Sequence, residues 1–216
     1  MTRFDHFPKE TLQFLTDLKA NNDRQWFADH KYDYEAQVKA PTERFCTALA
    51  MGLQKLTQVP HSSKTYRIYR DVRFSKDKSP YNPYIHLSFS PENGGNNAPM
   101  WFFGLDSGKL ALGCGVFQFD KAVLERFRAD MAGPKGAALI ELSTNLSAKG
   151  IRISEPELKR VPPGFDKDHP HVEALRRKGF SGWKDLNPEF AIGPDLIERT
   201  IKEFEGLLPI FRFLRS

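Results

Sequence analysis

Residues 65–89 read TYRIYRDVRFSKDKSPYNPYIHLSF, and the hydropathy pattern of this stretch decides the fold class. Between residues 66 and 74, apolar and polar side chains alternate with a period of two, which predicts a β-strand. Residues 75–80 have the polar, proline-ended composition of a turn. Residues 85–89 then repeat the alternation, which predicts a second strand beside the first.

Two further strands are expected downstream, at residues 100–105 and 109–116, and a short one at 151–153. No helical pattern separates the first four strands, so they should pair antiparallel with their neighbours in the chain. Outside this block apolar residues recur at helical spacing, which predicts helices at residues 8–18, 26–34, 41–56, 120–132, 137–145, 170–179 and from 194 onward. The fold class is therefore α+β. We expect an antiparallel meander sheet of about four to five strands, packed with helices from both chain ends in a single domain spanning residues 1–216.

The composition is that of a globular protein. Of the 216 residues 40% are hydrophobic, and 18 are phenylalanine, which excludes disorder over the whole chain. Arg3 and Asp5 stand where a secretory signal would begin its apolar run, and no uncharged stretch approaches the ~18 residues of a transmembrane helix. We therefore expect a cytoplasmic protein with no membrane association. Cys46 and Cys114 lie outside any CxxC pair, so we expect two reduced thiols.

The positive charge is concentrated in one place. The segment Lys64–Lys78, called the basic segment below, holds six lysines and arginines against two aspartates, so it carries nearly the whole net charge of +5. Such a concentration attracts anions, and arginine suits two-pronged contacts with carboxylate or phosphate. On a strand Arg70 would point to the apolar face, where it would need a carboxylate, a carbonyl or a bound anion as its partner.

Three residues outside the basic segment extend this candidate site. His86 leads the polar face of the neighbouring strand and could act there as an acid or base. Lys159 and Arg160 precede the stiff bend at residues 162–164 and could form a second wall. The candidate ligand-binding residues are Arg67, Arg70, Asp71, Arg73, Lys76, Lys78, His86, Lys159 and Arg160.

Several functions stay open on these residues. The favoured one is binding of, or catalysis on, a small phosphorylated or carboxylated ligand in a basic cleft. One alternative is a nucleic-acid-associated protein that uses the basic segment as a phosphate track. Another is a protein-interaction module that docks through Trp183 or the tail at residues 211–214. The simplest alternative is a charged surface in which Asp71 and Asp77 pair with their neighbours.

The sequence names no reaction. It contains no P-loop, dinucleotide-binding, metalloprotease or nucleophile-elbow motif, so whether the protein is an enzyme stays open, and no cofactor or metal is expected. The acidic and histidine residues at 166–171 fit a helix start better than a metal site. The glycines flanking Cys114 fit close packing better than ligand binding. The oligomeric state is not indicated.

The string RDVRFSKDKSPY at residues 70–81 closely resembles the hallmark of the domain of unknown function 2461 (DUF2461) family, a group of uncharacterised bacterial and fungal proteins. Other motifs agree: Asn21-Asn22, Trp26-Phe27, Tyr34 and Pro41 near the start, then LKRVPPGF at 158–165 and DHP at 168–170. The family usually has a lysine after the Pro-Tyr pair, where this chain has Asn82, so one positive charge of the turn is absent. The resemblance implies one domain and brings no established activity.

Overall fold

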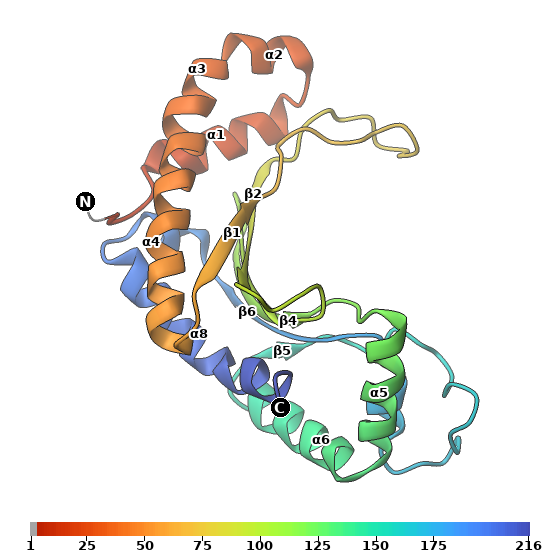
Figure 1. Ribbon diagram of the computed structural model, residues 1–216. Coiled ribbons are helices and arrows are strands. Elements are labelled where there is room, and N and C mark those ends of the chain that lie inside the picture. The colour runs from red at the N-terminus through yellow and green to blue at the C-terminus, as the bar shows by residue number, and fades with distance from the viewer. Residues whose placement is uncertain (1–3) are drawn as a thin grey trace. The chain divides into compact units, whose positions relative to one another are not determined.

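In the computed structural model, which describes residues 4–216, the strands form one six-stranded sheet in the order β1-β2-β3-β4-β6-β5 (Figure 1). The strands are β1 His61–Thr65, β2 Tyr84–Pro91, β3 Met100–Asp106, β4 Leu110–Val116, β5 Arg152–Ile153 and β6 Phe180–Leu186. β2, β3 and β4 are consecutive in the chain and adjacent in the sheet, as in a meander. β5 pairs antiparallel with β6, with Arg152 opposite Trp183. The predicted α+β class with an antiparallel sheet is confirmed, and β1 and β6 are the strands that the sequence did not predict.

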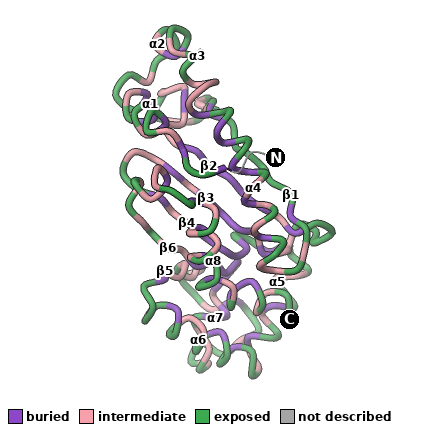
Figure 2. The backbone as a smooth tube through the Cα atoms, turned by 90° about the vertical axis from the view of Figure 1, so that its left-hand side faces the viewer, coloured by how far each residue is buried: buried purple, intermediate pink, exposed green. Residues whose placement is uncertain are grey.

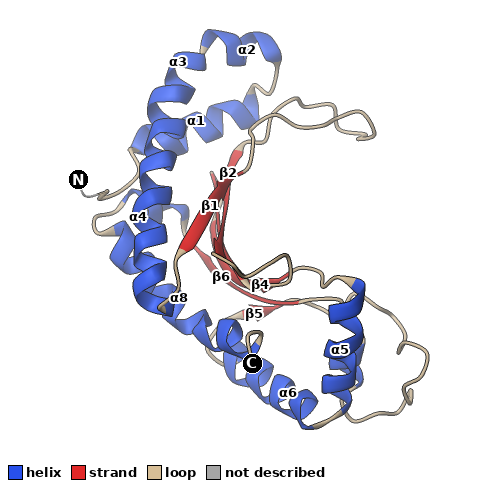
Figure 3. Cartoon of the chain, in the orientation of Figure 1, coloured by secondary structure: helices blue, strands red, loops and turns tan. Residues whose placement is uncertain are grey.

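Helices occupy both ends of the chain, as predicted (Figure 3). The α-helices are α1 Lys9–Ala20, α2 Arg24–Asp29, α3 Lys31–Asp33, α4 Ala40–Thr57, α5 Lys121–Ala132, α6 Pro134–Ser147, α7 Val172–Leu175 and α8 Leu196–Phe213. A π-helix, η1 Tyr34–Lys39, precedes α4, and a 3-10 helix, η2 Pro188–Ile192, precedes α8. α7 is much shorter than the helix predicted at 170–179, because the chain turns into β6 at Phe180. None of the helices in residues 4–216 has both the length and the apolar character needed to cross a membrane.

The strand predicted at residues 66–74 is wrong. The first strand, β1, lies just before it, and the alternating segment leaves the sheet after Tyr66, whose N–H donates to the His86 carbonyl at 3.0 Å. Residues 68–82 then fold back on themselves as a projecting hairpin, called the arm below (Figure 1). Its two sides are joined by an isolated bridge between Tyr69 and Tyr81. Pro80 and Pro83 have no N–H to donate, so this part of the chain cannot continue a regular ladder.

The chain divides into two compact units. The first comprises the residues through Phe89 together with Phe102–Leu112 and Asp185–Lys202. The second comprises Ser90–Trp101, Gly113–Lys184 and Glu203–Ser216. The basic segment and His86 belong to the first unit, and Lys159 and Arg160 belong to the second. That the whole chain is a single domain stays a prediction.

Aromatic rings form the core of the first unit. Phe45 on α4 packs against Phe103 on β3, with ring centroids 4.6 Å apart, and against Phe7 at 5.1 Å. All three rings are at most 1% exposed. The tube in Figure 2 shows β3 buried along most of its length. This core holds β2 and β3 firmly, and β2 carries Tyr84 and His86 next to the arm.

The second unit has its own aromatic core. Trp101 stacks on Phe211 at 5.3 Å and packs on Phe204 at 4.9 Å, both from α8. Phe211 is 3% exposed, so this part of the tail named above as a docking element lies in the core.

Candidate functional site

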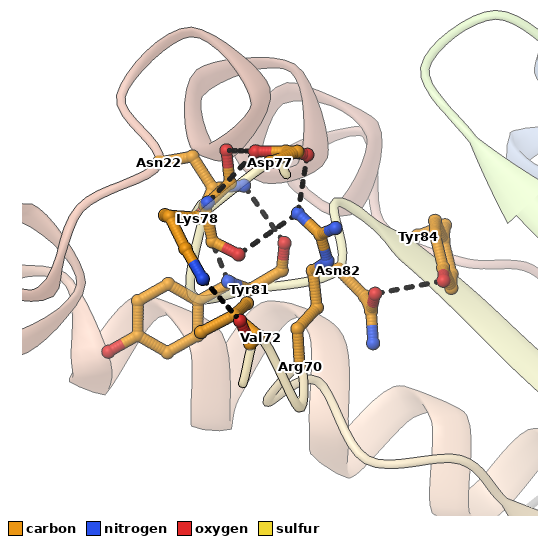
Figure 4. A network of polar contacts seen from close by, with 9 residues as sticks. Asn22, Arg70, Val72, Asp77, Lys78, Tyr81, Asn82 and Tyr84 are labelled. Atoms are coloured by element: carbon orange, nitrogen blue, oxygen red, sulfur yellow. Dashed lines mark hydrogen bonds and ion pairs between the residues drawn. The ribbon is translucent and has the colours of Figure 1, made fainter. Parts of the chain in front are cut away.

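The base of the arm is fixed by one asparagine. The Asn22 side chain donates to the Tyr81 carbonyl at 2.9 Å and accepts from the Tyr81 N–H at 3.0 Å, so it bonds both backbone polar groups of one residue (Figure 4). The Tyr81 ring stacks on Phe27 of α2 at 4.1 Å. α2 begins at Arg24, two residues before the predicted start at 26, and the Asp23 side chain caps it by accepting from the Trp26 N–H at 2.9 Å. The helical hairpin at the chain start therefore orients the arm.

Arg70 and Asp77 clamp the two sides of the arm together. Arg70 Nη1 donates to Asp77 Oδ2 at 2.6 Å and to the Ser79 carbonyl at 3.0 Å (Figure 4). Arg70 thus meets a carboxylate and a carbonyl, two of the partners expected from the sequence. The hydroxyl and N–H of Ser79, followed by Arg70, lower the pKa of Asp77 to about 2.

Two more positive charges of the basic segment are bonded inside the arm. Asp71 accepts from Arg73 Nε at 3.0 Å and from Nη2 at 2.7 Å, and this contact is the main reason that the pKa of Asp71 is lowered. Lys78 Nζ donates to the Val72 carbonyl at 3.0 Å (Figure 4). Arg70, Arg73 and Lys78 therefore hold the arm in shape.

A hollow of about 360 Å³ opens beside the base of the arm and is called the Arg67 hollow below. Its lining residues are Tyr66, Arg67, Tyr69, Arg70, Asp71, Asn82, Tyr84 and His86. Within residues 4–216 the Arg67 guanidinium forms no hydrogen bond or ion pair, although its charge contributes to the lowered pKa of Asp71. A second hollow, of about 220 Å³, shares Tyr66, Arg67 and Tyr84 and reaches the π-helix η1. Arg67 therefore lies at the junction of two hollows with its charge open to a ligand.

On the side of the sheet, the Arg67 hollow is lined by His86 together with Tyr84, both on β2. The His86 ring stacks on Tyr84 at 4.0 Å, and the Tyr84 hydroxyl donates to Asn82 Oδ1 at 2.8 Å. Across the sheet the ring edge faces Gly104, where a Cβ would lie 3.2 Å from His86 Cδ2. Desolvation by these neighbours is the main cause of the lowered pKa of His86, with Lys109 adding to the effect and Asp106 opposing it. A neutral imidazole at pH 7 can both donate and accept a hydrogen bond.

The model of the conserved hypothetical protein family DUF2461 matches residues 10–213. The chain belongs to the DUF2461 family. The match includes the arm, its Asn22 anchor and every residue of the Arg67 hollow, so the resemblance seen in the sequence is confirmed. No curated protein matches the chain.

The structure separates the residues predicted for the site of this DUF2461 protein into three groups. Arg67, Arg70, Asp71 and His86 line the Arg67 hollow. Arg73, Lys76 and Lys78 lie toward the tip of the arm, outside that lining. Lys159 and Arg160 lie in the second unit. They follow Leu158, whose carbonyl accepts a hydrogen bond from Arg176 Nε at 2.6 Å. Their role as a second wall stays a prediction.

Sequence reasoning missed four residues of the hollow. They are Tyr66, Tyr69, Asn82 and Tyr84. Only Asn82 carried a signal, because it replaces the lysine usual in DUF2461 proteins. Tyr66 and Tyr69 fall within the strand predicted at residues 66–74, Tyr84 lies just before the next predicted strand, and nothing local shows that the chain folds these rings around Arg67.

The remaining candidates have structural contacts. A Cβ on Gly113 would lie 2.6 Å from the Trp183 ring, which confirms that this glycine serves close packing. Cys114 is fully buried, and burial raises the pKa of its thiol well above the ordinary value. His171 Nδ1 contacts the Met131 carbonyl at 3.0 Å, and Asp166 accepts from the Asp168 N–H at 2.9 Å. No group of three or more His, Cys, Asp or Glu in residues 4–216 is arranged to hold a metal ion.

Proposed function

We propose that this DUF2461 protein binds a small phosphorylated or carboxylated ligand in the Arg67 hollow. One observation carries the proposal: the Arg67 guanidinium lines a hollow while forming no hydrogen bond or ion pair within residues 4–216. A guanidinium presents planar, paired donors that match the oxygens of carboxylate and phosphate. An arginine without a carboxylate partner keeps these donors available.

The other groups of the hollow suit an anion with polar substituents. The volume of about 360 Å³ lies near the lower end of the range for small-molecule sites. Asn82 and the neutral His86 add hydrogen-bonding groups without adding negative charge. Asp71 is the one carboxylate in the lining, and its charge is offset by Arg73 through two hydrogen bonds. Arg70 adds a second positive charge at the edge, although its Nη1 is bonded within the arm.

Isothermal titration calorimetry with sulfate, phosphate and small dicarboxylates tests the proposal. Hydrogen bonds to charged groups contribute about 1.5–3 kcal/mol, so Arg67→Ala should lower the affinity by roughly 10-fold to 150-fold. Lys55→Ala is the matched control, since Lys55 is exposed on α4 and lines neither hollow. Equal weakening by both substitutions would show diffuse attraction to net charge and would overturn the proposal. Absence of binding to the whole panel would also overturn it.

A further inference from the structure

Exposed aromatic side chains gather on the same segment as Arg67. Three of the large hydrophobic side chains exposed in residues 4–216 lie within nine residues of sequence, namely Tyr66 at 45%, Tyr69 at 53% and Phe74 at 96% exposure. A single exposed aromatic residue on a protein surface is ordinary. Three on one short segment, one of them almost fully exposed, form a surface that favours contact with another molecule.

Positive charges alternate with these rings. Lys64 Nζ lies over the Tyr66 ring at 5.0 Å, and the Arg73 guanidinium lies over Phe74 at 5.9 Å. Arg67 stands between Tyr66 and Tyr69 in the sequence, and Lys76 is exposed just past Phe74. Two of the three rings therefore have a cation over them, and all three keep part of their surface open.

Contacts across the arm tie the backbone on both sides of Phe74. The Arg70–Asp77 clamp and the Lys78 contact with the Val72 carbonyl join the two sides of the arm around its tip. Tyr69 packs edge-on against Phe27 at 6.0 Å, so α2 holds it in place while half of it stays exposed. Rings held in place lose less conformational entropy on binding than rings on a free loop.

From this arrangement we propose that the anionic ligand of the Arg67 hollow is a phosphate of a single-stranded nucleic acid, whose bases stack on Tyr66, Tyr69 and Phe74. The inference rests on the proposed function, because Arg67 supplies the phosphate contact. Proteins that bind single strands combine cations that follow the backbone with aromatic rings that stack on successive bases. The segment from Lys64 to Lys76 has both kinds of group in alternation.

A membrane is a less suitable partner for the same surface. Binding in the lipid interface depends on a contiguous apolar face inserted below the headgroups. Here Phe74 is the one apolar ring among the three, and polar or charged side chains separate it from the tyrosines. Base stacking needs only a ring face for each base, and tyrosine supplies that face as well as phenylalanine.

Fluorescence anisotropy with labelled single-stranded oligonucleotides of about 12 nucleotides tests the inference. Stacking substitutions cost about 5-fold to 150-fold in affinity per base, so Phe74→Ala should weaken binding by a factor in this range. Phe74→Leu keeps the apolar bulk without the aromatic face and should weaken binding nearly as much. Tyr32→Ala is the matched control, because Tyr32 is 83% exposed in the same unit but lies outside the basic segment.

Three further titrations separate the possible outcomes. A duplex of the same sequence should bind more weakly than the single strand, and affinity should fall with rising salt as counterions are released. If sulfate binds through Arg67 but oligonucleotides bind no tighter and Phe74→Ala changes nothing, this inference fails while the proposed function stands. If the unsubstituted protein binds neither sulfate nor the oligonucleotide, the inference and the proposed function are both overturned. Binding to anionic vesicles that survives Phe74→Leu, without oligonucleotide binding, would assign the surface to membranes and overturn the inference.

Discussion

The arm and Arg67, which precedes it in the basic segment, use their charges in opposite ways. In the arm Arg70, Arg73 and Lys78 are bonded to a carboxylate or a backbone carbonyl. In the hollow Arg67 forms no such bond within residues 4–216. Both aspartates of the segment follow Arg67 in the sequence and lie where the chain folds back. The comparison shows that the net charge of a segment does not tell which of its cations are already bonded within the protein, and the proposed function rests on an arginine that is not.

The arm's ion pairs contribute little to global stability. The Asp77 side chain is 62% exposed and that of Arg73 is 77% exposed, and solvent screens pairs as exposed as these. Their effect is local, because they fix the path of a hairpin that has no regular ladder. The arm should therefore depend on its anchors at Asn22 and Phe27 for stability and on its ion pairs for shape.

The largest effect on stability is expected at the buried anchor of the arm. Tyr81 is 5% exposed and stacks on Phe27, so Tyr81→Ala should lower the free energy of unfolding by about 3–5 kcal/mol, as for other buried aromatic residues. Tyr66→Ala, on the hollow side, is the comparison, and its effect should stay under about 1 kcal/mol because the ring is nearly half exposed. Urea unfolding followed by circular dichroism measures both. Equal losses in the free energy of unfolding would show that Tyr81 anchors the chain no more strongly than Tyr66 does.

A smaller effect is expected at the second anchor. Asn22→Ala removes both hydrogen bonds to the Tyr81 backbone and should cost about 1–3 kcal/mol, because it leaves part-buried backbone groups unsatisfied. Its neighbour provides the control: the Asn21 side chain donates to the Asp17 carbonyl at 3.0 Å in an exposed position and forms no hydrogen bond with the arm. If Asn21→Ala destabilises the protein as much in the same urea titration, then the contact with Tyr81 is not what makes Asn22 important.

Much of the fold could be predicted from the sequence because the signals are local. β2, β3 and β4 follow apolar patterns read within a few residues, and the helical spacing predicted α1 and α4 to within two residues of their ends. β6 escaped prediction because its sequence, FSGWKDL, has no clear alternation. The π-helix η1 likewise has no signature that separates it from the α-helical spacing around it.

The arm shows why a periodic pattern can mislead. Residues 66–74 alternate as a strand would, but the residue that fixes the fold of this region, Asn22, bonds Tyr81 from 59 positions away in the chain. Such a contact has no trace in the local pattern. The need of Arg70 for a partner could be predicted, since a guanidinium among apolar residues must be satisfied. The sequence could not predict that Arg67 would be the arginine of this segment whose guanidinium has no partner within residues 4–216, because the pairing depends on how the arm folds back.

Substituting each arginine in turn should separate the two roles. Arg70→Gln removes the clamp and should speed amide hydrogen exchange at positions 70 and 82. The N–H groups at these positions donate across the arm to the carbonyls of Pro80 and Ile68. The free energy of unfolding should change by no more than about 1 kcal/mol. Arg67→Gln should leave these exchange rates unchanged while weakening sulfate binding. Hydrogen exchange followed by NMR tests this reciprocal pattern, and faster exchange in both variants would contradict it.

The smallest effect concerns the acid limit of the arm. The pKa of Asp77 is lowered to about 2 in the folded chain, below its ordinary value near 3.8, so its contribution to stability is present above that ordinary value. This contribution is lost as the pH falls through about 2. Ser79→Ala removes the hydroxyl, the largest single cause, and keeps the backbone N–H, so it should raise the pKa of Asp77 at least as much as Arg70→Gln does. Carboxyl carbon shifts measured by NMR between pH 1.5 and about 5 report this pKa directly. A larger rise in Arg70→Gln would show that the ion pair, and not the serine turn, keeps the carboxylate ionised.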